Sequence, residues 1–117
     1  MNNQSVDSIA LCRADIEKLQ EVKTYIDINL HEVLTISTLA SRFSLSETTL
    51  RRHFIFYYRL PVYRYIFRCR MKKAKELLAN GSLHLPEVAT AVGYKRYTSF
   101  LHAFTSYYGV APSRYQY

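Results

Sequence analysis

Two arginines near the middle of the chain have the chemistry and spacing of side chains that read DNA bases. Residues 47–57 predict a helix whose apolar side chains face a core, which leaves Thr48, Arg51 and Arg52 on or near the opposite side. Arginine donates two parallel hydrogen bonds to guanine O6 and N7, the commonest base-specific contact in the major groove. We therefore predict that these three side chains contact bases of double-stranded DNA.

A second predicted helix, over residues 97–108, offers a weaker set of the same kind. Tyr97, Thr98 and His102 point outward if the phenylalanines of this helix point inward. His102 stands two residues before a phenylalanine, as Arg52 does. A histidine can hydrogen-bond a base, but it is mostly neutral at pH 7. We predict that these three side chains read bases in a second site, with less sequence information than the first.

Positive charge is concentrated in the middle third of the chain. Of the net charge of +7, residues 1–41 contribute −3 (3 basic, 6 acidic), residues 42–75 +9 (10 basic, 1 acidic) and residues 76–117 +1 (3 basic, 2 acidic). Such a block attracts a polyanion, although a solvated basic face without a partner is the alternative. The predicted phosphate contacts are Ser46, Arg64, Arg68, Lys72, Lys95 and Arg96.

Other functions find little support in the residue types. Cys12 and Cys69 stand alone, so we expect reduced thiols and neither a metal site nor a disulfide framework. Paired carboxylates, a Gly-rich phosphate loop and a catalytic triad setting are absent from the sequence, so we predict no enzyme and no cofactor. Without a long apolar run or a secretory signal, we expect a cytoplasmic protein with no membrane partner. The many aromatic rings leave RNA as an alternative ligand, but most occupy predicted core positions.

Apolar periodicity predicts an all-α fold of about seven helices. Helices are expected from Ile16 to about Leu30 with Asp15 as the cap, over 36–43, 47–57, 62–80, 86–92 and 97–108, and in a last turn from Pro112. The predicted organisation is a flexible segment (1–14), a helix-turn-helix subdomain (15–60), a linking helix (61–81) and a second helix-turn-helix subdomain (82–117). The linking helix would be roughly 28 Å long, close to the ~34 Å of one turn of duplex.

The two subdomains are predicted to be copies of one unit. Leu39-Ala40 corresponds to Val88-Ala89 at a shift of 49 residues, whereas Phe54 corresponds to Phe104 at a shift of 50. The Tyr57-Tyr58 pair also recurs after 50 residues, so the extra residue falls in the turn of the second unit. Two short helices with a tight turn, present twice, indicate a duplicated helix-turn-helix.

These residues resemble the DNA-binding domain of the AraC/XylS family of bacterial transcription activators. The resemblance runs from about Val22 to Tyr115, and its main motifs are Leu39-Ala40, Ser46-x-x-x-Leu50-x-Arg52-x-Phe54, Arg70-Met71-x-x-Ala74-x-x-Leu77-Leu78, Val92-Gly93-Tyr94 and Phe100-x-x-x-Phe104. It implies a bilobal domain of seven helices, whose third and sixth helices read adjacent major grooves, and contact with bacterial RNA polymerase.

Three positions depart from the family pattern. His102 stands where the family usually has arginine, which puts base reading by the second helix in doubt. Arg59 and Ser44 stand where glycine is usual or frequent, and glycine adopts positive φ more cheaply than either residue.

The whole pattern predicts a sequence-specific regulator of transcription, with activation favoured over repression. The length resembles that of the small standalone family members that bind DNA as monomers, and we expect the protein on the bacterial nucleoid. The alternative is the C-terminal part of a longer regulator, since the first fifteen residues read like a linker. The rival function is a protein-interaction module that binds RNA polymerase or another regulator with weakened DNA readout, which His102 favours.

Overall fold

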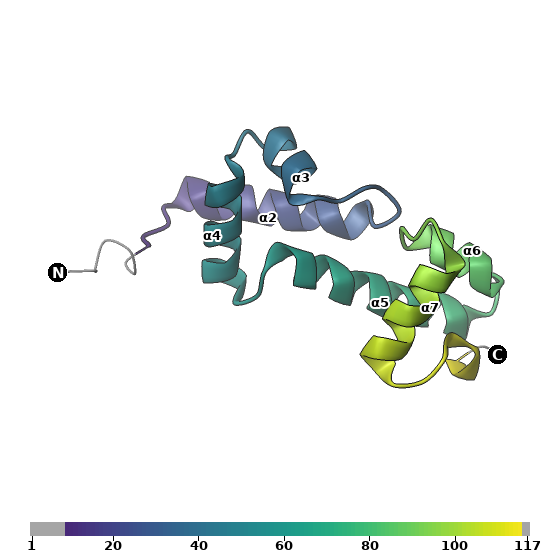
Figure 1. Cartoon of the computed structure of the whole chain (residues 1–117). Coiled ribbons are helices and arrows are strands. Elements are labelled where there is room, and N and C mark those ends of the chain that lie inside the picture. The colour runs from purple at the N-terminus through teal and green to yellow at the C-terminus, as the bar shows by residue number, and fades with distance from the viewer. Residues whose placement is uncertain (1–8, 116–117) are drawn as a thin grey trace. The chain divides into compact units, whose positions relative to one another are not determined.

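The computed structural model of the chain describes residues 9–115, and within that range every regular element is helical (Figure 1). The elements are α2 (Arg13–Ile28), α3 (Ile36–Arg42), α4 (Glu47–Tyr58), α5 (Val62–Asn80), α6 (Leu85–Ala91), α7 (Tyr97–Tyr108) and the short 3-10 helix η1 (Pro112–Tyr115). The all-α prediction is confirmed, and helices α3 to α7 begin and end within one residue of their expected positions.

Helix α2 begins earlier than expected. Its first backbone hydrogen bond is accepted by the carbonyl of Cys12, which therefore occupies the cap position. Asp15 was expected there but lies inside the first turn, where its carboxylate accepts the backbone N–H of Cys12 at 3.1 Å. This hydrogen bond lowers the pKa of Asp15. The expected flexible segment 1–14 is therefore wrong for residues 13–14, which are helical, and residues 1–8 lie outside the described range.

The chain divides into two compact units. One holds the described residues up to Ile28 together with Leu34–Tyr65, and the other holds Asn29–Val33 and the residues from Ile66 onward. Helix α5 is one uninterrupted helix whose first turn belongs to the first unit and whose remainder belongs to the second. The loop Asn29–Val33, although it precedes α3 in the sequence, groups with the second unit.

In the first unit, α4 packs against both α2 and α3 (Figure 1). The buried side chains come from one face of each helix: Leu19, Val22 and Ile26 of α2, Leu39 and Ala40 of α3, and Leu50 and Phe54 of α4. Thr35 caps α3 by accepting the backbone N–H of Thr38 at 3.1 Å. The face of α4 that carries the predicted DNA contacts is thus set by the burial of the opposite face.

In the second unit, the C-terminal part of α5 packs against α6 and α7. Its core consists of Met71, Ala74, Leu78, Val88, Ala89, Val92, Phe100 and Phe104. On α5, Met71 and Ala74 are fully buried, whereas Lys73 between them is exposed. The part of α5 that faces this core therefore runs through Met71, Ala74 and Leu78.

The two helix-turn-helix turns share one hydrogen-bond pattern, which supports the predicted duplication. Leu45 N–H donates to the Ala40 carbonyl at 2.8 Å, and its counterpart Tyr94 N–H donates to the Ala89 carbonyl at 2.9 Å. The residue before each of these donors has positive φ, 56° at Ser44 and 95° at Gly93.

The ends of helices α4 and α7 match in the same way. Arg59 after α4 has φ 66°, and Gly109 after α7 has φ 77°. The backbone N–H of each donates to the carbonyl four residues earlier. Arg59 and Ser44 thus adopt a left-handed conformation that glycine adopts more cheaply, at a cost of roughly 1–2 kcal/mol each.

Candidate nucleic-acid interface

The three predicted base-reading side chains of the first unit share one solvent face of α4. Thr48, Arg51 and Arg52 are all exposed, whereas Leu50 and Phe54 on the other side are fully buried. A short helix with two adjacent arginines and a threonine on its free face fits a major groove, because phosphates and guanine edges both accept from guanidinium groups. The arrangement expected from the sequence is therefore present.

Contacts within the chain leave Arg51 and Arg52 available to a ligand. Arg51 forms an ion pair with Glu47 one turn earlier, with 3.4 Å between Nη2 and Oε1, and both side chains are about half exposed. Exposed pairs of this kind contribute little, about 0.3–0.5 kcal/mol. Among residues 9–115 no ion pair holds Arg52.

Ser46 already has a structural role at the start of α4. Its hydroxyl accepts the backbone N–H of Thr49 at 3.0 Å and donates to the Thr49 side-chain oxygen at 2.8 Å. This N-cap explains the serine without any phosphate. A phosphate contact by Ser46 stays a prediction.

The second unit presents a smaller polar face. Thr98 and His102 are exposed on α7, and the basic residues Lys95 and Arg96 are exposed just before it. Tyr97, expected to point outward, is half-buried, and its ring packs 6.3 Å from that of Phe100. Tyr97 is thus held partly in the core, and its remaining surface is smaller than the sequence suggested.

Arg96 occupies the cap position of α7 without any side-chain hydrogen bond to the helix. Its counterpart in the first unit, at a shift of 50 residues, is the capping Ser46. Arginine is a poor helix cap, since it offers no acceptor oxygen. Arg96 therefore does not stabilise the start of α7 as Ser46 stabilises the start of α4, and its contact with a phosphate stays a prediction.

The predicted phosphate contacts of α5 lie along its solvent side. Arg64, Arg68 and Lys72 follow one another at steps of four residues and are all exposed. Lys75, which continues the series, sits 5.1 Å and 4.9 Å from the ring centres of Tyr108 and Tyr115. Its ammonium group is therefore partly engaged within the second unit.

Arg70 carries a structural function that sequence reasoning missed. It lies partly buried on α5, and its guanidinium donates to the carbonyls of Leu30 at 3.3 Å and Glu32 at 2.9 Å. Its Cζ also lies 5.8 Å from the ring centre of Tyr94, and burial lowers the pKa of Arg70. A Cβ on Gly93 would lie 2.3 Å from the Leu30 carbonyl oxygen. Arg70 thus fastens the loop Asn29–Val33 to the turn that precedes α7.

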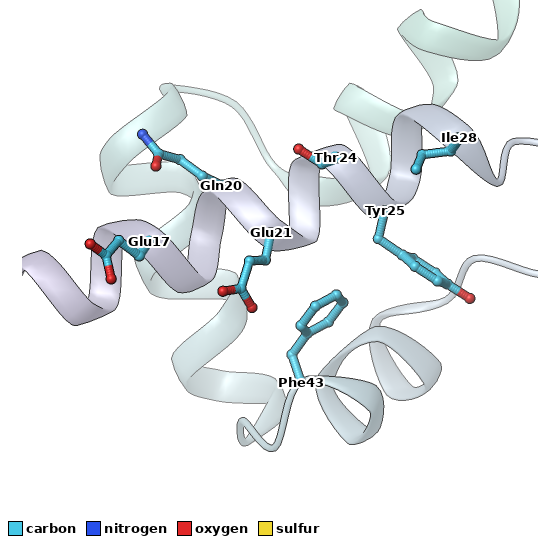
Figure 2. Close-up of a pocket in the computed structure, with 7 residues that line it drawn as sticks. All are labelled: Glu17, Gln20, Glu21, Thr24, Tyr25, Ile28 and Phe43. Carbon is cyan, nitrogen blue, oxygen red and sulfur yellow. The ribbon is translucent and has the colours of Figure 1, made fainter.

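A shallow groove on the first unit has a different character from these basic faces (Figure 2). Its lining comes from α2 and the residue after α3: Glu17, Gln20, Glu21, Thr24, Tyr25, Ile28 and Phe43. Ile28 is 68% exposed, and Glu17 and Glu21 stand one turn apart without an ion pair among the described residues. The carboxylates repel phosphate, so this groove suits a protein partner better than DNA.

No group of three or more histidine, cysteine or acidic side chains is arranged to hold a metal ion in residues 9–115. None of the helices in this part of the chain is long and apolar enough to span a bilayer.

Comparison with known proteins identifies relatives for this arrangement. A family model described as a helix-turn-helix domain matches residues 39–117. The Msm operon regulatory protein of Streptococcus mutans is 30% identical over 98 residues, which cover 84% of this chain and 35% of that protein. The chain therefore spans about a third of the length of that relative.

Solved structures share the fold over most of the chain. The C-terminal domain of AraT, a response regulator from Geobacillus stearothermophilus, superposes with a TM-score of 0.81 at 28% identity, covering 85% of this chain and 83% of that one. The DNA-binding domain of AdpA, a global transcriptional factor solved with a target DNA, superposes with a TM-score of 0.79 at 26% identity, covering 84% and 88%.

Proposed function

Because the chain belongs to the AraC/XylS family of DNA-binding transcriptional regulators, we propose that it recognises a specific duplex by inserting α4 and α7 into major grooves. The observation that carries this proposal is the exposed face of α4, where Thr48, Arg51 and Arg52 lie together opposite a fully buried face. These side chains would contact base edges, with arginine preferring guanine.

Phosphate contacts would supply most of the affinity. The candidates are the exposed basic side chains Arg64, Arg68, Lys72, Lys95 and Arg96, with Ser46 at the start of α4. Each phosphate neutralised releases counterions, so affinity is expected to fall steeply with salt on every sequence. Arg96 is the strongest candidate of this set, because it is exposed at the cap position of α7 and makes no side-chain hydrogen bond to the helix.

The second unit would read fewer bases than the first. Thr98 and His102 are its exposed candidates, and Tyr97 contributes only the part of its ring that Phe100 leaves free. We expect the base preference in the half-site of α7 to be weaker than in the half-site of α4.

Replacing Arg52 by alanine tests base reading by α4. We expect a loss of about 1–3 kcal/mol on the preferred duplex and a relaxed base choice at one position. Arg64→Ala is the matched control, because it removes the same charge from α5 and should weaken all duplexes alike. An equal loss on preferred and random duplex for Arg52→Ala would mean that Arg52 holds only phosphate.

A monomer would engage two adjacent major grooves on one face of the DNA. The support is α5, whose nineteen residues run without interruption and correspond to roughly 28 Å of helix. Half-sites one duplex turn apart, ~34 Å, are the expected spacing. Analytical ultracentrifugation of the complex should give one protein per duplex, and two would contradict the monomer.

The acidic groove on α2 favours contact with a protein (Figure 2). We propose that bacterial RNA polymerase binds this groove, and that the protein activates transcription in this way on the nucleoid. A basic segment with an apolar anchor fits Glu17 and Glu21 beside the exposed Ile28. Glu21→Lys should reduce transcription in vitro and leave duplex affinity close to that of the control Glu76→Lys, which makes the same charge change on α5. Equal transcription by both variants would contradict this role.

The same groove also favours the rival function, a protein-interaction module without sequence-specific DNA binding. That function predicts polymerase retention together with duplex binding that is no stronger for any sequence than for random DNA. Measuring both on one preparation separates the two functions.

A further inference from the structure

We propose that Ile55 recognises the 5-methyl group of thymine in the half-site bound by α4. This inference rests on the proposed function and deepens it, because it assigns a base type to a residue outside the predicted site. The observation behind it is an isoleucine that is 45% exposed on the face where the base-reading side chains lie.

Helix geometry places Ile55 in the middle of that face. It follows Thr48 by seven residues, Arg51 by four and Arg52 by three. At 3.6 residues per turn, Ile55 lies within roughly 20° of Thr48 around the helix axis and between the directions of the two arginines. The neighbouring Phe54 is fully buried in the core of the unit. Ile55 is the next residue of the helix and therefore points in a different direction, away from that core.

Folding does not account for an isoleucine at this position. Isoleucine forms helices less readily than arginine, lysine or glutamate, and 45% of the surface of Ile55 stays in solvent. In a helix its branched side chain keeps one strongly preferred χ1 rotamer. It would therefore meet a ligand as a rigid apolar group, with little conformational entropy to lose.

Thymine is the base that fits such a group. It alone presents an apolar methyl in the major groove, where the other base edges present donors and acceptors. Burying one methyl is worth about 0.8 kcal/mol, which corresponds to roughly a fourfold change in affinity at 1.4 kcal/mol per tenfold. The equivalent position on α7 is the exposed Thr105, whose single methyl is a smaller apolar group, so the second half-site should show a weaker preference for thymine.

Deoxyuridine tests the contact atom by atom, because it removes only the thymine methyl and keeps base pairing. The probe is a duplex selected by the protein from a random pool, and the α4 half-site is the one in which Arg52→Ala weakens binding. We expect one thymine in that half-site whose replacement lowers wild-type affinity about fourfold. Ile55→Ala should bind the thymine and uracil duplexes equally, and Thr105→Ala should behave as wild type.

Two results would overturn the assignment to Ile55. One is a preferred α4 half-site in which no uracil replacement affects the wild type or in which Ile55→Ala keeps the full effect. The other is loss of the effect in Thr48→Ser but not in Ile55→Ala, because the methyl would then be read by the threonine. A selection that yields no preferred duplex would instead refute the proposed function, and the inference with it.

Discussion

Substitution of the half-buried Arg70 tests how the second unit holds helix α7 in place. Arg70→Met keeps the length and apolar stem of the side chain but removes both donors to the loop Asn29–Val33. It also removes the cation above the Tyr94 ring. The loop and the turn before α7 would then lose their common fastening, while the core of Met71, Ala74 and Phe100 would remain.

The size of the effect follows from these contacts. Hydrogen bonds from charged groups contribute about 1.5–3 kcal/mol each, and the carbonyls that remain can recover part of that from water. The Glu32 contact is exposed and the Leu30 contact is only partly buried, so we take about 1 kcal/mol for each, the value of an ordinary hydrogen bond. With roughly 0.5 kcal/mol from the contact with Tyr94, we expect a loss of about 2–3 kcal/mol in the stability of the second unit.

Hydrogen exchange read by mass spectrometry measures where the loss falls. In Arg70→Met, amides of residues 29–33 and 92–96 should exchange faster than in wild type, with those of α4 unchanged. DNA binding should weaken in the half-site of α7 and stay intact in that of α4. Arg70→Lys should recover part of both effects, because a lysine still donates to one carbonyl.

Arg68→Met is the matched control, since it removes the same charge from an exposed neighbour on α5. It should weaken binding to all duplexes alike without faster exchange in either segment. Exchange in Arg70→Met that matches Arg68→Met, or an equal loss of affinity at both half-sites, would refute the positioning of α7 by Arg70.

Two further predictions compare equivalent positions of the two units by denaturant unfolding. Tyr108 donates to the Met71 carbonyl at 3.2 Å, whereas the buried hydroxyl of Tyr58 has no partner in the described part of the chain. Tyr108→Phe should therefore lower the free energy of unfolding by about 1 kcal/mol, whereas Tyr58→Phe should leave it unchanged or raise it. Equal losses in the two variants would contradict this prediction. The Arg59→Gly variant should be about 1 kcal/mol more stable to unfolding than Arg59→Ala. Gly109→Ala should lower the free energy of unfolding by a similar amount. The added Cβ at position 109 meets no atom within 4 Å, so alanine tolerated at both positions would show that positive φ carries no penalty here.

The helices were predictable because their signals are local. Apolar spacing marked the buried face of α4, and the breaks at Asn80-Gly81 and Tyr108-Gly109 marked helix ends. The start of α2 was missed because Cys12 is not a typical cap residue, and the Asp15 carboxylate serves the cap from inside the helix.

The remaining errors concern contacts between segments far apart in sequence. Helix α5 carries apolar residues on two adjoining stripes, and only its packing partners decide that the stripe of Met71, Ala74 and Leu78 is the one buried in the core. Arg70 binds carbonyls about forty residues away, for which a single sequence holds no signal. Tyr97 was predicted to be exposed because the spacing of apolar residues does not reveal its ring contact with Phe100 one turn later.

Selection of bound duplexes from a random pool, at two salt concentrations, tests the central claim most directly. We expect two half-sites about 10 base pairs apart from centre to centre. The more sharply defined one should lose its preference in Arg52→Ala, and affinity should fall steeply between the two salt concentrations. A pool that stays random, or binding that does not respond to salt, would contradict the claim that α4 and α7 read DNA.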